Sequence, residues 1–158
     1  HNSRATVYAG GPGPRCRDRP GCGLTKTTAG RKNWNLVLQG SNLSTGCSTV
    51  ALDPNDPNVI FAGLWDFRRK GWTFRSGGDC PDQPSGSGLF RSGDGGTTWT
   101  ELTPEASKGF PKKPYGRIAV AIAPSNAKRV YAFVESTDSA LFVSADGGTP
   151  VNNRDKSH

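Results

Sequence analysis

The segment Ser92-Gly93-Asp94-Gly95-Gly96-Thr97-Thr98-Trp99 decides the fold class of this chain. It separates two short runs with strand character. Its two adjacent glycines can adopt the positive φ angles of a tight hairpin, and the Ser92 and Asp94 side chains can bond amides of the turn. Trp99 can cover the turn and pack between strands. The segment therefore predicts a β-hairpin in which the polar residues have structural roles.

The same pattern returns 52 positions later as Ser144-Ala145-Asp146-Gly147-Gly148, where Val151 stands at the tryptophan position. A degenerate copy occupies 27–34, with Ala29 at the aspartate position and Arg31 at the second-glycine position. We therefore expect the hairpin bonds at 92–99 and at 144–148, whereas the copy at 27–34 lacks the carboxylate and the glycine that make them.

Other short segments repeat with a similar step. Val7-Tyr8-Ala9, Ile60-Phe61-Ala62 and Val130-Tyr131-Ala132 each precede one copy of the hairpin, and 50–54 matches 120–124 at an offset of 70. A period of roughly 50 residues, with several short strands per unit, is typical of β-propeller blades. The repeats therefore indicate one all-β architecture for the whole chain.

We predict about two and a half propeller blades of four-stranded antiparallel sheets. Blade one covers 5–39, blade two 48–102 and blade three 116–158, with three, four and three strands. The outer strand of blade three is expected to be missing or poorly formed. Because each blade buries its faces only against its neighbours, further blades must come from a longer chain, from further copies or from another chain. We favour a fragment of a larger propeller.

The composition agrees with a turn-rich β protein. The chain has 21 Gly and 12 Pro in 158 residues, a hydrophobic fraction of 33% and a net charge of +7. No run is long enough to cross a membrane and no nucleic-acid-binding motif accompanies the basic residues, so we expect neither membrane insertion nor a nucleic-acid partner. The start at His1, without a signal-peptide pattern, is interpreted as that of a processed or trimmed product.

The four cysteines are Cys16, Cys22, Cys47 and Cys80. They show no zinc-binding spacing, and the only histidines are terminal, so no metal or other cofactor is predicted. An even number in turn-rich segments favours disulfides over free thiols, with Cys16–Cys22 and Cys47–Cys80 as candidate pairs. Disulfides would place the protein in an extracellular or periplasmic compartment, so we expect it to be secreted.

An inserted loop at 66–87 is the best candidate for ligand binding. It mixes aromatic and guanidinium side chains, which can stack on sugar rings and bind anions. It lies on the same end of the blades as 11–22 and 40–47. The candidate ligand-binding residues are Trp65, Arg68, Arg69, Trp72, Phe74 and Arg75. The alternative is a loop packed on itself, with its aromatic residues covering the top of the blades.

Catalytic residues are not identified. The carboxylates at the loop end are Asp18, Asp66, Asp79 and Asp82, and nothing in their spacing makes a glycosidase pair. A Ser-His-Asp triad is excluded because both histidines are terminal. We assign the remaining repeat-associated aspartates to turns, namely Asp53, Asp56, Asp94 and Asp146. Asn42-Leu43-Ser44 is a glycosylation sequon that matters only in a eukaryotic secretory protein.

The hairpin segments resemble the Asp-box, or BNR repeat, of β-propellers. The residues that match its structural positions are Ser92, Asp94, Gly96, Trp99, Ser144, Asp146 and Gly148. Together with the turn at 53–58 and the stretch 64–78, they make the chain similar to large bacterial sortilin-like and xyloglucanase-like propeller proteins, from residue 7 to about 155. The resemblance implies the fold, whereas one fold hosts many activities.

Three function classes remain open. The first, which we favour, is an exported propeller module that recognises or scaffolds a glycan or protein partner without catalysis. The second is a fragment of a glycoside hydrolase, xyloglucanase-like or sialidase-like; the resemblance implies catalytic aspartates from separate propeller domains, and no segment here matches such a motif. The third is a structural subunit of an extracellular assembly, in which another chain covers the open blade faces.

Overall fold

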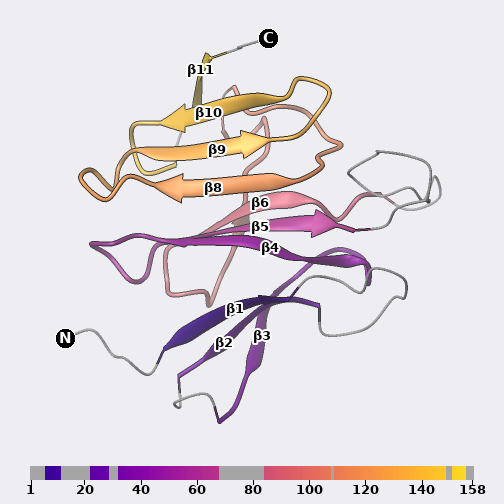
Figure 1. The fold of residues 1–158 in the computed structure, drawn as a ribbon, viewed down its shortest axis with the longest axis vertical. Helices are drawn as coiled ribbons and strands as arrows, with labels where there is room; N and C mark the ends of the chain where they lie inside the picture. Colours follow the sequence, from indigo (N-terminus) through magenta and orange to yellow (C-terminus); the bar gives the residue numbers. More distant parts are fainter. Residues whose placement is uncertain are drawn as a thin grey trace.

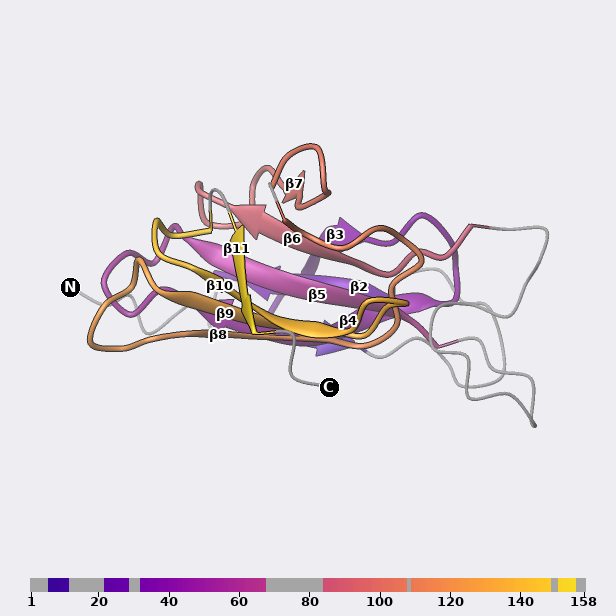
Figure 2. The same cartoon turned by 90° about the horizontal axis from the view of Figure 1, so that it is seen from above.

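The computed structural model describes residues 6–11, 22–28, 32–67, 84–107, 109–148 and 151–155. These residues form eleven β-strands in three antiparallel sheets, and no helix occurs among them. None of the described segments could therefore cross a membrane as a helix. Figure 1 shows the three sheets one above another, and seen from above they overlap (Figure 2). The prediction of an all-β chain is confirmed.

Each sheet is a meander in which consecutive strands pair. Sheet one contains β1 (Val7–Gly11), β2 (Gly23–Thr27) and β3 (Asn35–Gln39). Sheet two contains β4 (Thr45–Leu52), β5 (Ile60–Asp66), β6 (Gly88–Ser92) and β7 (Thr100–Glu101). Sheet three contains β8 (Ile118–Ile122), β9 (Val130–Val134), β10 (Ala140–Ser144) and β11 (Val151–Asp155).

The strand β11 corrects one expectation. The outer strand of the third blade is present, and it pairs with β10 through Ser144 opposite Val151 and Leu141 opposite Asp155, with a register shift between Leu141 and Phe142. The strand begins at Val151, which follows Pro150 in the sequence. The strand counts are therefore three, four and four.

Successive side chains along a strand point to opposite faces of its sheet, so neighbouring residues can pack against different adjacent sheets. In β4, Val50 packs toward sheet one and Ala51 packs toward sheet three. In β8, which matches β4 at an offset of 70, Val120 packs toward sheet two and Ala121 is exposed. Val50 and Val120 thus each face the preceding sheet, as the stacking of repeated units requires.

Two hydrophobic cores fill the spaces between the sheets. Between sheets one and two lie the buried residues Leu24, Leu38, Cys47, Ala62 and Leu64. Between sheets two and three lies a larger core that includes Phe61, Leu89, Phe110, Ile118 and Phe142. Sheet two is covered on both sides, and this arrangement leaves its two ends as the places where loops gather.

Candidate functional site

The blades have two ends with different chemistry. The hairpin end, at the left of Figure 1, carries the turns after β6 and β10, and the loop end, at the right, carries the connections into β4 and out of β5. At the hairpin end, Gly95 N donates to Asn58 O at 2.9 Å and Gly147 N donates to Lys128 O at 2.7 Å. Each hairpin is therefore held against the turn between the first two strands of its own sheet.

The first hairpin, 92–99, is held by its own side chains. Ser92 Oγ accepts hydrogen bonds from Gly96 N at 2.8 Å and from Asp94 N at 3.3 Å. The Asp94 carboxylate accepts from the Thr98 hydroxyl at 2.6 Å, from Thr98 N at 2.9 Å and from the Ser92 hydroxyl at 2.8 Å. These bonds lower the pKa of Asp94 to about 2, and the bond from the Thr98 hydroxyl contributes most.

The second hairpin, 144–148, repeats this geometry. Gly148 N donates to Ser144 Oγ at 2.8 Å, Asp146 N donates to the same oxygen at 3.2 Å, and the Ser144 hydroxyl donates to Asp146 Oδ1 at 2.5 Å. In the first hairpin, Trp99 Nε1 also donates to Gly96 O at 3.2 Å. The serine and aspartate side chains of both hairpins thus have partners inside their own turn, so these residues hold structure.

The other aspartates that we assigned to turns do the same. Asp53 Oδ1 accepts from Asn55 N at 2.8 Å and from Asp56 N at 3.2 Å, and Asp56 Oδ1 accepts from Asn58 N at 2.9 Å. Short Asp and Asn side chains bond backbone amides two or three residues ahead in this way. The assignment of Asp53 and Asp56 to turns is confirmed.

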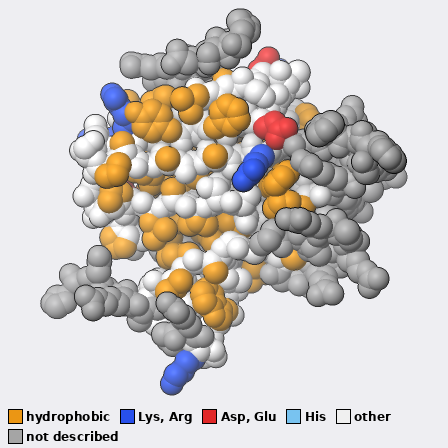
Figure 3. Space-filling model, viewed as in Figure 1, with side chains coloured by type: hydrophobic (Ala, Val, Ile, Leu, Met, Phe, Trp, Pro, Cys, Tyr) orange, Lys and Arg blue, Asp and Glu red, His pale blue; other side chains and the backbone are white. Residues whose placement is uncertain are grey.

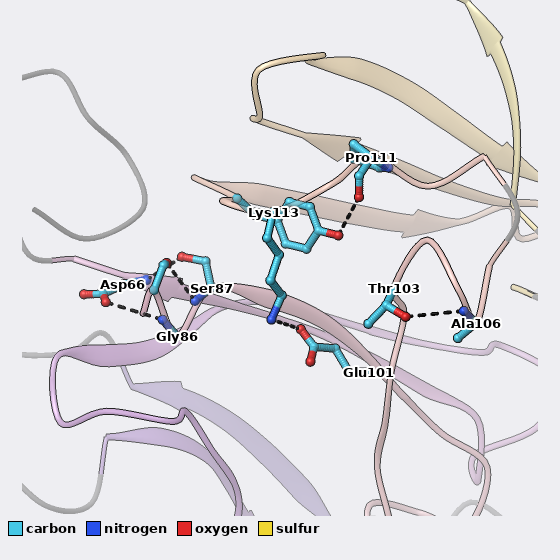
Figure 4. A network of polar contacts seen from close by, with 10 residues as sticks. Asp66, Gly86, Ser87, Glu101, Thr103, Ala106, Pro111 and Lys113 are labelled. Atoms are coloured by element: carbon cyan, nitrogen blue, oxygen red, sulfur yellow. Dashed lines mark hydrogen bonds and ion pairs between the residues drawn. The ribbon is translucent and has the colours of Figure 1, made fainter. Parts of the chain in front are cut away.

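A buried carboxylate organises the loop end. Asp66, at the end of β5, is 3% exposed. Its Oδ1 accepts from the Ser44 hydroxyl at 2.7 Å and its Oδ2 accepts from Asn42 Nδ2 at 2.8 Å and from Gly86 N at 3.4 Å. Its own amide donates to Ser87 Oγ at 2.9 Å, and Figure 4 shows Asp66 beside Gly86 and Ser87. Asp66 therefore joins the connection at 40–47 to both ends of the inserted loop.

This network also explains the sequon. Asn42 Nδ2 donates to Asp66 and to Pro84 O at 3.2 Å, while Asn42 Oδ1 accepts from the hydroxyls of Ser44 and Thr45. Glycosylation of Asn42 would replace one of the two amide hydrogens that make these bonds. The geometry thus gives this asparagine a structural role, and it confirms that 40–47 and the ends of 66–87 share one end of the blades.

An aromatic and cationic cluster lies beside the carboxylate. We call it the Trp65 cluster, and it consists of Trp65, Phe67 and Arg117. The rings of Trp65 and Phe67 are 4.3 Å apart between centroids, and the Arg117 guanidinium lies 5.6 Å from the Trp65 ring. Arg117 is exposed, whereas both aromatic residues are half-buried. Since Trp65 belongs to sheet two and Arg117 precedes β8, the cluster bridges two blades.

Of the predicted ligand-binding residues, the structure describes Trp65. Arg68, Arg69, Trp72, Phe74 and Arg75 lie outside the described residues, as do Asp18, Asp79 and Asp82. Sequence reasoning missed Arg117, which stands 52 positions after Trp65. A signal was available, because Arg117 directly precedes an inner strand and inner strands start at the loop end.

The cysteines differ from expectation. Cys22 and Cys47 are both free, and each predicted disulfide includes one of them, so neither pair is formed in the structure; Cys16 and Cys80 lie outside the described residues. Cys47 is 3% exposed in the core between sheets one and two. Burial raises the pKa of its thiol to about 11. The reason for the difference is a β-bulge between Cys47 and Thr49, which resets the faces of the strand, and the sulfur packs into the core.

A small cavity of about 230 Å³ lies beside the linker after β7. Two of its lining residues bond groups beside it: Lys113 Nζ lies 2.6 Å from Glu101 Oε1, and the Tyr115 hydroxyl donates to Pro111 O at 2.6 Å (Figure 4). Burial, aided by Glu101 and Glu105, raises the pKa of Tyr115 to about 12. The cavity is below the size of an ordinary ligand site. Among the described residues no group of His, Cys, Asp and Glu is arranged to hold a metal ion.

Comparison with known proteins identifies the fold. No family model matches the chain, and neither does any curated protein. An ancestral GH74 enzyme has a TM-score of 0.66 and 19% identity over 100% of this chain and 18% of its own. The GH74 enzyme of Niastella koreensis has a TM-score of 0.56 and 20% identity over 86% of this chain and 18% of its own. The GH74 xyloglucanase of Xanthomonas campestris has a TM-score of 0.56 and 18% identity over 84% and 17%.

These similarities show the fold and not the activity, because identities are 18–20%. The chain spans less than a fifth of the length of these solved proteins. With three stacked antiparallel sheets, it is a part of a β-propeller, as the sequence repeats predict.

Proposed function

We propose that this chain is a section of a larger exported propeller that recognises a glycan or protein partner at its loop end, without supplying a catalytic pair. The observation that carries the proposal is the Trp65 cluster, in which an exposed guanidinium lies over an aromatic ring at the junction of two blades. Aromatic faces bind sugar rings, and a guanidinium binds carboxylates and phosphates. The hydrogen bonds of the two hairpins support membership of the Asp-box, or BNR, repeats, with sortilin-like propellers as relatives.

We infer that the chain supplies no catalytic pair because two of its loop-end carboxylates, Asp66 and Glu135, are engaged in structural hydrogen bonds. A glycosidase needs two carboxyl groups on either side of the scissile bond. Asp66 is buried and its two oxygens bond Asn42, Ser44 and Gly86. Glu135 accepts from Arg117 N at 2.9 Å. Among the described residues, Asp66 thus serves to anchor loops, and we propose that it takes no part in proton transfer.

A second candidate is a section of a glycoside hydrolase. It is favoured by the three solved relatives above, all of which are GH74 enzymes, one of them named a xyloglucanase. In this case the chain would present the Trp65 cluster as part of a substrate-binding surface, and the catalytic carboxylates would come from other blades. Release of reducing sugar from xyloglucan by the intact protein would favour this candidate over recognition alone.

The test compares two arginine variants in the longest natural form of the protein. Arg117→Ala removes the cation from the Trp65 cluster, while Arg129→Ala removes an exposed cation at the hairpin end. Binding is measured by titration calorimetry with xyloglucan oligosaccharides and with acidic oligosaccharides. We expect the affinity to fall about fivefold or more in Arg117→Ala, because a cation–π and charge contact is lost. The affinity of Arg129→Ala should stay unchanged. Equal affinity of the two variants would refute a binding role for the cluster.

A further inference from the structure

Contacts between consecutive blades follow a repeated rule. The hydroxyl of Tyr8, in β1, donates to Gly95 O in the hairpin of sheet two at 2.8 Å. Lys26 Nζ, one residue before the end of β2, donates to the same carbonyl at 2.6 Å. The backbone of one hairpin is thus held by an aromatic residue and a cation of the preceding blade.

The next pair of blades repeats the rule. Phe61 occupies the Tyr8 position and its ring packs against Gly148 in the second hairpin. Arg91 occupies the Lys26 position, and its Nε donates to Gly147 O at 3.2 Å. The guanidinium also lies 5.9 Å from the Phe61 ring. Two interfaces therefore place an aromatic residue and a cation at the same two positions against the next hairpin.

In the third blade, the two equivalent positions lie on a face that no described residue of the chain covers. Tyr131 occupies the Tyr8 position and Val143 the Lys26 position. They are paired with each other across β9 and β10, next to the pair Phe133 and Leu141, so all four share one face. Phe133 is 52% exposed and Leu141 is 38% exposed, in contrast to Phe142 on the opposite face at 1%. We call this the outer face of sheet three.

The outer face of sheet three extends over the inner strand. Ala119 lies opposite Phe133 and Ala121 opposite Tyr131 in the pairing of β8 with β9, and both alanines are exposed. In Figure 3, hydrophobic side chains gather over the upper part of the viewed face, where Figure 1 shows β8 to β10. A contiguous apolar surface of this kind marks an interaction site.

We propose that the outer face of sheet three binds a fourth blade of the same polypeptide, whose hairpin carries two adjacent glycines. The Tyr131 hydroxyl donates to the carbonyl of the first of these glycines, as Tyr8 donates to Gly95. Val143 replaces the cation of the earlier interfaces, so the fourth hairpin lacks the second bond and is held by apolar contact.

The second glycine is favoured by its positive φ in both hairpins, and in the second hairpin also by the aromatic ring beneath it. Gly96 has φ +83°, and a Cβ built there would lie 3.4 Å from the Tyr8 ring. Gly148 has φ +98°, and a Cβ there would lie 2.7 Å from the Phe61 ring. A side chain at this position would be strained by the positive φ in both hairpins, and in the second hairpin it would also clash with the Phe61 ring. The same restriction applies to any hairpin that settles on Tyr131.

This restriction decides between a further blade and a second copy. A second copy stacked by the same rule would present its first blade, in which Arg31 stands at the second-glycine position. An arginine there cannot repeat the contact. The ancestral GH74 enzyme also matches this whole chain within 18% of one polypeptide, which supports a continuous chain over an assembly of short ones.

The experiment is hydroxyl-radical footprinting of the longest natural form of the protein, read by mass spectrometry. Phe133 and Phe142 are residues of one type on neighbouring strands, so their oxidation rates compare directly. A covered face gives Phe133 a rate as low as that of Phe142. A face open to solvent gives Phe133 a rate far above Phe142, and that result overturns the proposal. Because no ligand is added, the outcome is independent of the binding proposed at the loop end.

A matched pair of variants tests the same point through stability. Phe133→Glu places a charge on the outer face, while Leu43→Glu places one on an exposed loop residue, 43% exposed. We expect Phe133→Glu to lower the Tm by at least about 4 °C more than Leu43→Glu. Equal shifts overturn the proposal. Protection of Phe133 that disappears on dilution, in a protein whose intact mass is 16.8 kDa, identifies a second copy and also overturns it.

Discussion

The two ends of the blades hold their turns and loops with hydrogen bonds of different range along the chain. At the hairpin end, Ser92 and Asp94 satisfy the turn with bonds that span at most four residues, and Ser144 and Asp146 repeat them. At the loop end, one carboxylate, Asp66, bonds groups that lie 20 to 24 residues away along the chain. The serine and aspartate bonds of the repeated end therefore stay within each turn, whereas the end that does not repeat holds loops and carries the candidate binding residues.

The largest effect is expected at the loop end. Asp66→Ala leaves the Asn42 amide, the Ser44 hydroxyl and the Gly86 amide without their acceptor, and we expect a loss of about 3 kcal/mol in the free energy of unfolding. Urea denaturation measures it. The control is Asp138→Ala, an exposed loop-end carboxylate, which should change stability by less than about 0.5 kcal/mol. Similar losses in both variants would remove the distinction between the two ends.

Glycines of the second hairpin test whether the hairpin end depends on the neighbouring blade. Gly148→Ala meets the Phe61 ring at 2.7 Å in addition to its φ of +98°, whereas Gly147→Ala has φ +80° and no atom within 4 Å. We expect a loss of about 2–3 kcal/mol for Gly148→Ala and of about 1 kcal/mol for Gly147→Ala, measured by urea denaturation. Equal losses would show that only the backbone conformation matters and would weaken the rule proposed for the fourth blade.

Acid titration tests the self-contained bonding of the first hairpin. The folded-state pKa of Asp94 is lowered from 3.8 to about 2, so its contribution to stability is present above pH 3.8 and is lost as the pH falls toward 2. Subtracting the pH profile of Asp94→Asn from that of the unmodified protein isolates this contribution, since the other carboxylates remain in both. The difference should shrink between these two pH values. A flat difference would mean that Asp94 is not hydrogen-bonded as a carboxylate.

The smallest effect is expected for the thiol of Cys47, which is buried in the core between sheets one and two. Cys47 is buried and the pKa of its thiol is raised to about 11, so at pH 8 it is protonated and shielded. The neutral thiol stabilises the folded state below pH 9, and this contribution is lost as the pH rises toward 11. We expect iodoacetamide to modify Cys47 at pH 8 only after urea is added, as peptide mapping without reductant can show. A Cys47–Cys80 disulfide peptide would contradict the free thiol.

Several parts of this structure follow from local sequence. The hairpin bonds were predictable because Ser92, Asp94 and Gly96 lie within five positions of one another, so no knowledge of other strands is needed. The strand positions followed from the repeats at Tyr8, Phe61 and Tyr131. The outer strand β11 was not predicted because Pro150 and the polar residues after Val151 lack the pattern of a strand, whereas its partner β10 has that pattern.

Other parts needed the folded chain. A bulge shifts the faces of a strand by one residue, and short-range patterns do not reveal it. The bulge beside Cys47 thus turned a predicted disulfide partner into a core thiol. The Asp66 network and the contact between Trp65 and Arg117 also join residues far apart in sequence.

The amino-acid sequence by itself determined the repeating units of this protein, their all-β character and the turns that close them. Those features depend on neighbours within a few residues, or on alternation along one strand. Only the tertiary structure decided which side chains meet between blades and at the loop end, such as Tyr8 with Gly95 and Arg117 with Trp65. The reason is that these contacts depend on how one sheet stacks on the next, which no short segment encodes alone.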